Sequence, residues 1–318
     1  MTGKPQKLRV GTRGSRLALI QTEMVCDLLR AAHPGIELET VVIKATGDWT
    51  PAQGEVRLSE QAGGKGQYVQ NIEDYIRSGR IDIGVHSCKD VPTHMPADLV
   101  IDHFLARGDA RDAFISNKAL SLDELPEGAV VGTSSVRRQA VILNRRPDLK
   151  VVTFRGNVDT RLEKLNNGQV DATILAAVGL QRMGREEVIS SYIEPEAMLP
   201  AVGQGTIALE CRKGDSVISD LLDAINHKET HIITVAERAV LAVLDGSCGT
   251  PIGSYAFFPE AGKMRLRAFI ATPDGHEIFH SDETAPVKTV DDAYALGLRV
   301  GRSLKSLVPE AVLLACVS

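Results

Sequence analysis

Segments typical of strands and of helices alternate along most of the chain, and this alternation constrains the fold more than any other feature of the sequence. Residues 8–13 predict a short strand, residues 15–33 an amphipathic helix, and residues 37–45 a second strand. The pattern continues with a helix at 68–79 and with strands at 81–87, 129–135, 151–156 and 172–177. Because such alternation is typical of parallel sheets with helices on their faces, we predict doubly wound α/β domains.

The chain beyond residue 225 follows a different pattern. An antiparallel meander of three strands and a covering helix are predicted at 254–258, 263–271, 276–283 and 290–308. We therefore expect a separate small α+β domain, entered near residues 225–230.

Two glycine-rich stretches connect these elements. Residues 46–67 predict a long loop that contains the sequence GGKG, and loops of this length in compact domains are usually functional or disordered. Residues 198–205 precede a strand at 206–211, which we expect to return the chain to the first domain.

Composition excludes several classes of protein. The chain of 318 residues has a net charge of −5, 4% aromatic residues and one Trp, which disfavours a nucleic-acid binder. No apolar run is long enough to span a bilayer, and the N-terminus leads from a short basic tail into a strand without a signal-peptide core. The five cysteines are odd in number and lack CxxC or CxxH spacing, so we expect reduced thiols in the cytoplasm. An enzyme or a ligand-binding module remains.

One segment opposes the sign of the whole chain. Residues 130–185 contain ten basic residues, eight of them Arg, against four acidic ones. The planar fork of Arg bonds both oxygens of a carboxylate or phosphate, so this segment is a candidate anion site. A solvated helix face is the other interpretation.

Two strand ends share a local sequence. Val10-Gly11-Thr12 and Val131-Gly132-Thr133 each precede a predicted helix, with Ser15 and the pair Ser134-Ser135 at the cap positions. Free N–H groups and a positive dipole end make both helix starts candidate anion sites.

Arg16, Arg137 and Arg138 lie in first helical turns, where the helix dipole disfavours a cation by roughly 0.3–1 kcal/mol. Either an anionic ligand lies between these side chains and the helix ends, or the side chains bend into water. Arg155 and Arg161 add cations near the carboxyl edge of the sheet, where open α/β sheets bind ligands.

The segment HSCKDVPTH directly follows the strand at 81–87. Lys89-Asp90 therefore lies where that strand leaves the sheet. The pair is either a surface salt bridge or a catalytic carboxylate kept ionised by its neighbour. His86 and His94 have no third ligand nearby, so we expect no metal.

Cys248 lies in the small-residue loop GSCGTPIG. A cysteine on such a loop is accessible and becomes nucleophilic where its thiolate is favoured, whereas a chance cysteine in a turn needs no function. No His is paired with it in the sequence.

Taken together, these segments resemble the porphobilinogen deaminase family, also called hydroxymethylbilane synthases, of tetrapyrrole biosynthesis. The resemblance runs from about residue 8 to the final helix. It is carried by GTRGSRLAL (11–19), GGKGQYV (63–69), DIGVHSCKDVPT (82–93), DARDAF (109–114), VGTSSVRRQ (131–139), RRPDL (145–149), RGNVDTRL (155–162), LPAVGQG (199–205) and GSCGTPIGSY (246–255).

The resemblance implies three domains. The first two would resemble periplasmic binding proteins, and the third would be a small α+β domain with an antiparallel sheet and the cysteine loop. The corresponding limits are residues 1–105 with 206–224, residues 106–205, and residues 225–318.

The resemblance also implies a chemistry. A dipyrromethane cofactor, joined to Cys248 by a thioether, would prime the addition of four porphobilinogen molecules with loss of ammonia, and hydrolysis would release linear hydroxymethylbilane. Asp90 would be the catalytic carboxylate, because a carboxylate near pyrrole N–H groups stabilises positive charge and manages protons. The acetate and propionate groups of the pyrroles would account for the arginines. A non-catalytic, two-domain carboxylate binder is the alternative function.

On the family pattern, further residues contact the cofactor or the substrate. Expected to bind the cofactor, besides Cys248, are Ser87, Lys89, Thr133, Ser134, Ser135, Arg137, Arg138 and Arg161. Expected to bind the substrate are Arg13, Ser15, Lys65, Tyr68, Arg155, Arg182 and Gln204. The family also implies a cytoplasmic monomer.

The chain departs from the family pattern at a few positions. Cys88 stands where Met is usual, Ser247 where Gly is usual, Tyr68 where Phe is common, and Gln61 where Lys is expected. Cys88 beside Asp90 is an expected site of oxidation.

Overall fold

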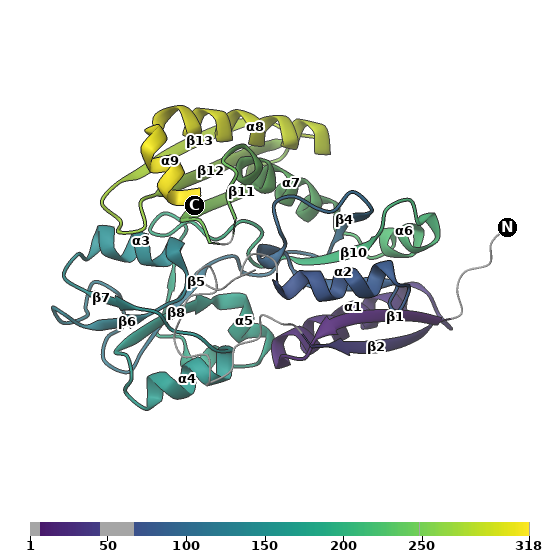
Figure 1. The fold of residues 1–318 in the computed structure, drawn as a ribbon, viewed down its shortest axis with the longest axis horizontal. Helices are drawn as coiled ribbons and strands as arrows, with labels where there is room; N and C mark the ends of the chain where they lie inside the picture. Colours follow the sequence, from purple (N-terminus) through teal and green to yellow (C-terminus); the bar gives the residue numbers. More distant parts are fainter. Residues whose placement is uncertain (1–6, 45–66, 248, 318) are drawn as a thin grey trace.

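The computed structural model describes residues 7–44, 67–247 and 249–317. Two mixed sheets with helices lie next to each other, and a three-stranded sheet with its own helices lies across them (Figure 1). The predicted fold class is confirmed. Among the described residues, no helix is long and apolar enough to cross a membrane.

The first sheet has the strand order β2-β1-β3-β10-β4. Its strands and helices are β1 (Lys7–Arg13), α1 (Arg16–Ala32), β2 (Glu37–Ile43), α2 (Gln67–Arg77), β3 (Ile83–Ser87), β4 (Leu99–Phe104) and β10 (Ile207–Arg212), with α6 (Ser216–Asp223) following. β1 runs parallel to β2 and β3, whereas β10 runs antiparallel to β3 and β4. The strand expected at 206–211 thus inserts between β3 and β4.

The second sheet has the order β7-β6-β8-β5-β9 and repeats the same pattern. Its elements are β5 (Asp112–Ser116), β6 (Val130–Gly132), α3 (Val136–Arg145), β7 (Lys150–Val152), α4 (Val158–Asn166), β8 (Ala172–Ala176), α5 (Ala177–Arg182) and β9 (Ser191–Ile193). β6 is parallel to β7 and β8, and β5 is antiparallel to β8 and β9. The fourth strand of each sheet, β10 in the first and β5 in the second, is antiparallel. In both cases the chain enters this strand directly after it has crossed over from the other sheet.

Two crossover segments, residues 105–111 and 194–206, join the sheets. They lie side by side, because the Gly108 N–H donates to the Gly205 carbonyl at 3.1 Å. Gly205 has φ +93°, and a Cβ there would lie 2.7 Å from the Gly108 carbonyl oxygen, so only glycine fits this close approach.

The third sheet, β11-β12-β13, is covered by helices on one face. Its elements are α7 (Lys228–Val243), β11 (Ile252–Glu260), β12 (Lys263–Ala271), β13 (Ile278–Pro286), α8 (Val290–Leu307) and α9 (Glu310–Val317). α8 begins at a capping box formed by Thr289 and Asp292.

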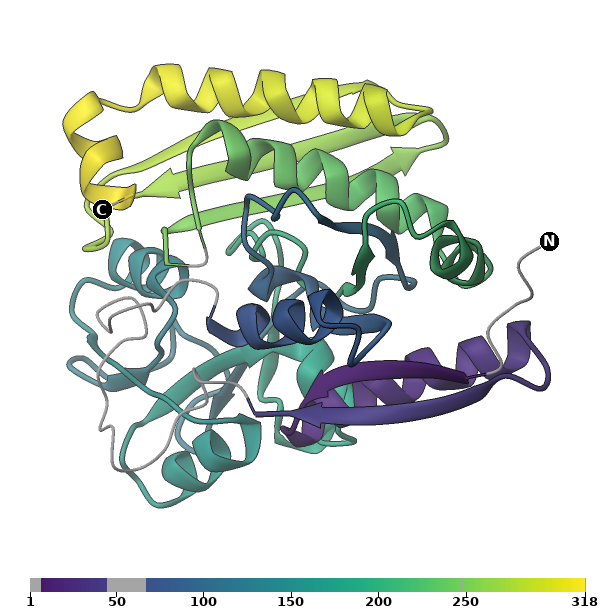
Figure 2. The ribbon, with the colours of Figure 1, turned by 45° about the vertical axis from the view of Figure 1, so that its right-hand side comes forward.

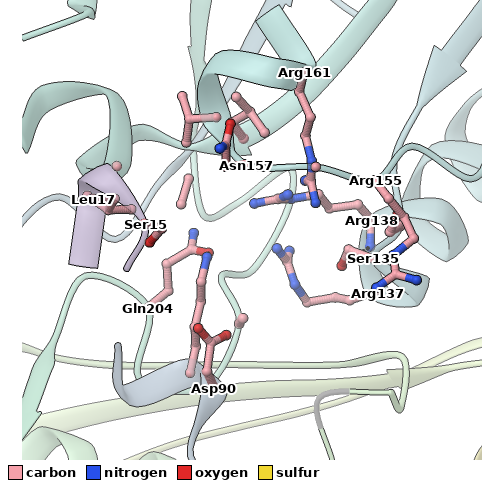
Figure 3. Close-up of a pocket in the computed structure, with 18 of the residues that line it drawn as sticks. Ser15, Leu17, Asp90, Ser135, Arg137, Arg138, Arg155, Asn157, Arg161 and Gln204 are labelled. Carbon is pink, nitrogen blue, oxygen red and sulfur yellow. Dashed lines mark hydrogen bonds between the residues drawn. The ribbon is translucent and has the colours of Figure 1, made fainter. Parts of the chain in front are cut away.

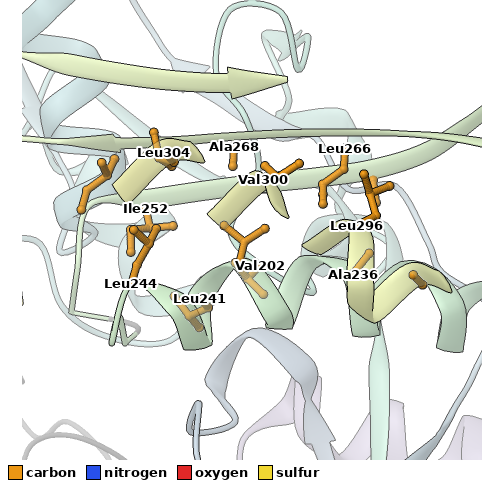
Figure 4. Close-up of a cluster of buried hydrophobic side chains, with 14 of the residues drawn as sticks. Val202, Ala236, Leu241, Leu244, Ile252, Leu266, Ala268, Leu296, Val300 and Leu304 are labelled. Carbon is orange, nitrogen blue, oxygen red and sulfur yellow. The ribbon is translucent and has the colours of Figure 1, made fainter. Parts of the chain in front are cut away.

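Residues of β12 alternate between two cores. Leu266, Ala268 and their neighbours pack against α7 and α8 (Figure 4), whereas Phe269 packs against the core of the second sheet. Val202 of the second crossover inserts into the core of the third sheet. The third sheet therefore packs on both the second sheet and the crossover, as the turned view shows (Figure 2).

Most predicted elements are present. The helices and most of the strands lie close to their predicted limits, but β6 and β7 are only three residues long. β4, β5 and β9 were not predicted. The predicted loop at 46–67 lies almost wholly outside the described residues. The limits given above for the three domains stay predictions.

Candidate functional site

A cavity of about 1130 Å³ lies between the two mixed sheets, beside the crossover segments and the start of the third sheet. Ligand pockets of proteins commonly measure about 300–1,000 Å³, so this one has room for a large ligand. Eleven of the residues predicted from the sequence line it: Arg13, Ser15, Lys89, Asp90, Ser134, Ser135, Arg137, Arg138, Arg155, Arg161 and Gln204.

Three helices begin at the wall of this cavity. Ser15 caps α1 by accepting from the Ala18 N–H at 3.3 Å, and Ser135 caps α3 by accepting from the Arg138 N–H at 3.4 Å. Asn157 caps α4 through the Thr160 N–H at 2.9 Å. Figure 3 shows the three capping residues around one space. The positive ends of three helices favour an anionic ligand.

Arg137 and Arg138 are buried and share one carboxylate. The Nη2 atoms of Arg137 and Arg138 each donate at 2.7 Å to a different oxygen of Asp112. Their Nη1 atoms donate to the carbonyls of Leu199 at 2.7 Å and Ile174 at 2.8 Å. Of the two interpretations of these arginines, bending into water is wrong; a buried carboxylate of the protein itself holds them.

Asp112 is fully buried, at 0% exposure. Burial alone would raise the pKa of its carboxyl group, but the charges of Arg137 and Arg138, with hydrogen bonds from Arg138 and Gln204, outweigh burial and hold the pKa well below its usual range. Burial lowers the pKa of Arg137. Asp112 thus remains ionised, and the group of three side chains keeps one net positive charge.

Gln204 connects this group to Lys89. Its Nε2 donates to Asp112 Oδ1 at 2.9 Å and to the Ala110 carbonyl at 2.7 Å, and its Oε1 accepts from Lys89 Nζ at 3.4 Å. Burial and then the charge of Arg138 lower the pKa of Lys89 to about 8. Lys89 is therefore a cation near neutral pH that alkaline pH neutralises.

Asp90 is half-buried and ends the single helical turn Cys88–Asp90 that follows β3. The Cys88 N–H donates to the Thr206 carbonyl at 2.9 Å, which fixes this turn on β10. Within the described part of the chain, the Asp90 carboxylate has no hydrogen bond or ion pair. It faces the same space as Gln204 and the arginines (Figure 3).

Arg16 behaves differently from the other two first-turn arginines. Its side chain is 58% exposed, and its Nη1 lies 3.8 Å from Asp159 Oδ1 of α4. Water and a surface ion pair satisfy it.

Three predicted residues do not line the cavity. Ser87 Oγ exchanges hydrogen bonds with the Gln21 amide at 3.1 Å, and Thr133 Oγ1 accepts from the Ser135 N–H at 3.1 Å. Arg182 Nη2 donates to the Gly205 carbonyl at 2.8 Å, and burial lowers the pKa of Arg182 to about 10.

Cys248 and Lys65 lie outside the described residues, as does the side chain of Tyr68, whose backbone belongs to α2. The neighbours of Cys248 in the sequence, Ser247 and Gly249, line the cavity.

The expectation that Cys88 is prone to oxidation is wrong. Cys88 is 2% exposed, and burial raises the pKa of its thiol to about 11. Oxidation requires an accessible thiolate, so this thiol is protected on both counts. A Cβ at Gly203 would lie 2.6 Å from the Cys88 sulfur, which shows how closely the second crossover covers it.

Several polar residues of the site were not identified from the sequence, and three of them have a clear structural place. Asp112 lies beneath the arginines, Asn157 caps α4, and Arg238 of α7 lines the cavity while donating to the Pro92 carbonyl at 2.7 Å. Two adjacent arginines in one first helical turn were the available signal, because such a pair requires a counter-charge. Among the described residues, no three His, Cys, Asp or Glu side chains are arranged to hold a metal ion.

The chain is similar in sequence to proteins of one known family. Residues 8–220 match the family model "Porphobilinogen deaminase, dipyromethane cofactor binding domain", and residues 232–306 match "Porphobilinogen deaminase, C-terminal domain". The chain is 44% identical over 307 residues to the chloroplastic porphobilinogen deaminase of Oryza sativa subsp. japonica, covering 95% of this chain and 84% of that protein. It is 46% identical over 305 residues to the porphobilinogen deaminase of Paracoccus denitrificans, covering 95% of each. Among solved structures, the methionine binding protein MetQ is similar with a TM-score of 0.44 and 14% identity, over 71% of this chain and 93% of that one.

Proposed function

The chain belongs to the porphobilinogen deaminase family, and on that premise we propose how its residues carry out the reaction. It is a hydroxymethylbilane synthase of tetrapyrrole biosynthesis with a dipyrromethane cofactor. It joins four porphobilinogen molecules head to tail with loss of ammonia and releases the linear product by hydrolysis. A non-catalytic carboxylate binder would need no C-terminal domain, and the family match includes that domain.

The observation that carries the residue assignments is the composition of the cavity wall. Three helix N-termini and a group of arginines meet there, together with Asp90, whose carboxylate makes no hydrogen bond or ion pair within the described residues. Each pyrrole of the substrate carries an acetate and a propionate, which arginine forks bind in two-point contacts. Nine Lys and Arg side chains line the cavity against three carboxylates, which suits a ligand that is rich in carboxylates and becomes positively charged at its rings.

The described residues fit the cofactor. Arg137 and Arg138 line the cavity, and their buried Nε atoms make no hydrogen bond within the described residues. In this proposal Cys248 holds the dipyrromethane by a thioether, and the carboxylates of the dipyrromethane are bound by Lys89, Ser134, Ser135, Arg137, Arg138 and Arg161. Ser87 and Thr133, which do not line the cavity, would support this wall through Gln21 and the Ser135 N–H. When bound, the group supplies the pyrrole carbon that begins the chain.

A second set of residues binds the incoming substrate. In this proposal these are Arg13, Ser15, Lys65, Tyr68, Arg155, Arg182 and Gln204. Arg182, at the end of α5, does not line the cavity and would act through the second crossover, because its guanidinium donates to the Gly205 carbonyl.

Asp90 is the proposed catalytic residue. Its carboxylate stabilises positive charge on the reacting ring and accepts or returns a proton at the pyrrole nitrogen. The main chain of its turn is fixed by the hydrogen bond from the Cys88 N–H to the Thr206 carbonyl, so the backbone that carries Asp90 does not have to be ordered during the reaction.

An intact-mass measurement tests the cofactor assignment. We expect the purified protein, or the protein after incubation with porphobilinogen, to exceed its polypeptide mass by two linked pyrrole units. Cys248→Ser should lack the excess, and the control Cys26→Ser, at a buried cysteine of α1, should keep it. A Cys248→Ser protein that still carried the added mass would refute the attachment site.

The catalytic assignment is tested by Asp90→Asn. We expect the variant to retain the added mass while product formation falls by about 100-fold or more, since general acid–base groups contribute about 10²–10⁴-fold. Asp102→Asn, at an exposed carboxylate on neighbouring β4, is the control and should keep its rate. Normal turnover in Asp90→Asn would remove Asp90 from the mechanism.

We further place the enzyme in the cytoplasm as a monomer. The support is chemical: Cys26, Cys88, Cys211 and Cys316 are free and buried, as in a reducing compartment. Light scattering coupled to size-exclusion chromatography should give the mass of a monomer. A mass twice as large would exclude the monomer.

A further inference from the structure

We infer that Asp112 is a positioning residue for the reaction, because it orients Arg137, Arg138 and the Gln204 amide toward the ligand. The inference rests on the proposed role of the two arginines as carboxylate binders. Asp112 does not line the cavity and is fully buried, so it acts through the groups that it holds.

The hydrogen bonds leave each guanidinium one orientation. Arg137 is held between Asp112 Oδ2 and the Leu199 carbonyl, and Arg138 between Asp112 Oδ1 and the Ile174 carbonyl. Two fixed acceptors on each planar group prevent rotation about its long side chain. Ligand binding then does not have to order these side chains, which otherwise costs about 0.5–1.5 kcal/mol for each.

Asp112 is itself fixed by the sheet. It is the first residue of β5 and lies opposite Ala176 of β8 and Ile193 of β9. A carboxylate at this register position cannot move without disturbing both neighbouring strands. The position of the arginines is thereby set by the sheet, in addition to their own helix.

The same carboxylate reaches the first sheet through Gln204. The path runs from Asp112 Oδ1 to Gln204 Nε2 at 2.9 Å, and from Gln204 Oε1 to Lys89 Nζ at 3.4 Å. Lys89 precedes Asp90 in the same helical turn. Asp112 therefore aligns cations on both sides of the cavity.

Charge balance adds to the geometry. Without Asp112, two adjacent buried guanidinium groups would repel each other and move apart, because a buried ion that loses its partner is strongly unfavourable. With Asp112 present, the pair stays together and still carries a net positive charge toward the cavity.

A double-mutant cycle of Asp112→Asn with Arg138→Gln tests the inference. We expect Asp112→Asn to lower kcat/KM for porphobilinogen by about 10- to 100-fold, mainly through KM, since a misplacement near 1 Å can cost about 100-fold. In the Arg138→Gln background, Asp112→Asn should lower kcat/KM by a several-fold smaller factor, because one of the two guanidinium groups that Asp112 holds is already absent. Asp123→Asn is the matched control. Asp123 accepts a hydrogen bond at 2.7 Å from Arg145, which lies on the exposed end of α3, the helix that also carries Arg138. Loss of the Asp123 carboxylate should leave kcat/KM unchanged.

Asp112→Glu separates positioning from folding. It keeps the charge but moves the carboxylate by one methylene, so we expect a raised KM at a thermal midpoint close to that of the wild type. If Asp112→Asn alone does not fold, the double variant restores the original net charge of the group and is compared with Arg138→Gln.

The outcomes separate the inference from the proposed function. Equal losses in both backgrounds, or Asp112→Glu with a normal KM, would overturn the positioning role and leave the arginine assignment standing. Arg137→Gln and Arg138→Gln with unchanged KM and unchanged cofactor loading would instead overturn the proposed carboxylate site, and the inference with it.

Discussion

At the scale of single residues, Lys89 sets a pH limit on ligand binding. Its pKa of about 8, lowered by burial and by Arg138, means that it is charged at pH 7 and largely neutral at pH 9. A bound carboxylate favours the charged form, so binding is strongest below pH 8 and weakens as pH rises through 8. Because Lys89 is a proposed cofactor ligand, we expect loading of the dipyrromethane onto the cofactor-free protein, measured as added mass, to fall about tenfold between pH 7 and pH 9, following the loss of the protonated fraction.

Lys89→Arg is the control for this effect. The guanidinium of Arg stays charged over the whole range, so the fall in cofactor loading should disappear from a pH series measured on the variant. The same fall in wild type and variant would assign the titration to another group.

Asp112 illustrates what the sequence does not reveal at this scale. In DARDAF it stands among other charged residues and has the pattern of an exposed loop carboxylate. Only the packing of β5 beneath α3 brings it to Arg137 and Arg138, which lie 25 and 26 residues further along the chain. Arg13, Asp90 and Gln204 were predictable because they lie within motifs of the family.

At the scale of elements, α7 and α8 are in closer contact than ordinary side chains allow. A Cβ at Gly297 of α8 would lie 2.4 Å from the Ala236 carbonyl oxygen, which belongs to the backbone and cannot move aside. Gly297→Ala gains up to about 1 kcal/mol in helix propensity. Overpacking costs about 1–3 kcal/mol, so the variant should be less stable in thermal unfolding.

Gly179→Ala is the matched control for this prediction. Gly179 is also helical, and its nearest contact would be Leu17 Cδ2 at an ordinary 3.5 Å. We expect no loss of stability there. A Gly297→Ala protein as stable as the wild type would mean that the two helices can separate at little cost.

Some strands are easier to predict from the sequence than others. β12 alternates clearly because one of its faces packs on α7 and α8 while the other meets the second sheet. Length alone does not decide this, because β6 and β7 have only three residues each and were still predicted from apolar runs. β5 starts with the charged Asp112, and β9 is the short segment Ser191–Ile193, so neither shows a clear apolar period.

At the scale of the whole molecule, Glu237 of α7 connects both crossovers to the third sheet. It is fully buried and pairs with Arg107 of the first crossover at 2.7 Å. It also accepts from the N–H groups of Gly203, in the second crossover, and Ala256, in β11, at 2.7 and 2.9 Å. Removal of one partner of a buried pair costs about 3–5 kcal/mol, so Glu237→Gln should shift the first unfolding transition in urea to lower concentration.

Glu260→Gln is the control for the buried pair. Glu260 and Lys263 form an exposed pair at 2.9 Å, which is worth about 0–1 kcal/mol. Equal effects of the two variants would show that Glu237 does not hold the sheets together.

The crossing of the chain between sheets also has a consequence for synthesis on the ribosome. β3 and β4 are complete once residue 104 has been made, but β10, the strand that lies between them, ends at residue 212. At about 5–20 residues per second, the ribosome takes on the order of 5–20 s to make the intervening chain. During that interval β4 has no partner strand and β3 is unpaired on one side, so both strands are open to pairing with other chains. The second sheet, by contrast, draws all its strands from one continuous stretch of chain and can be completed first.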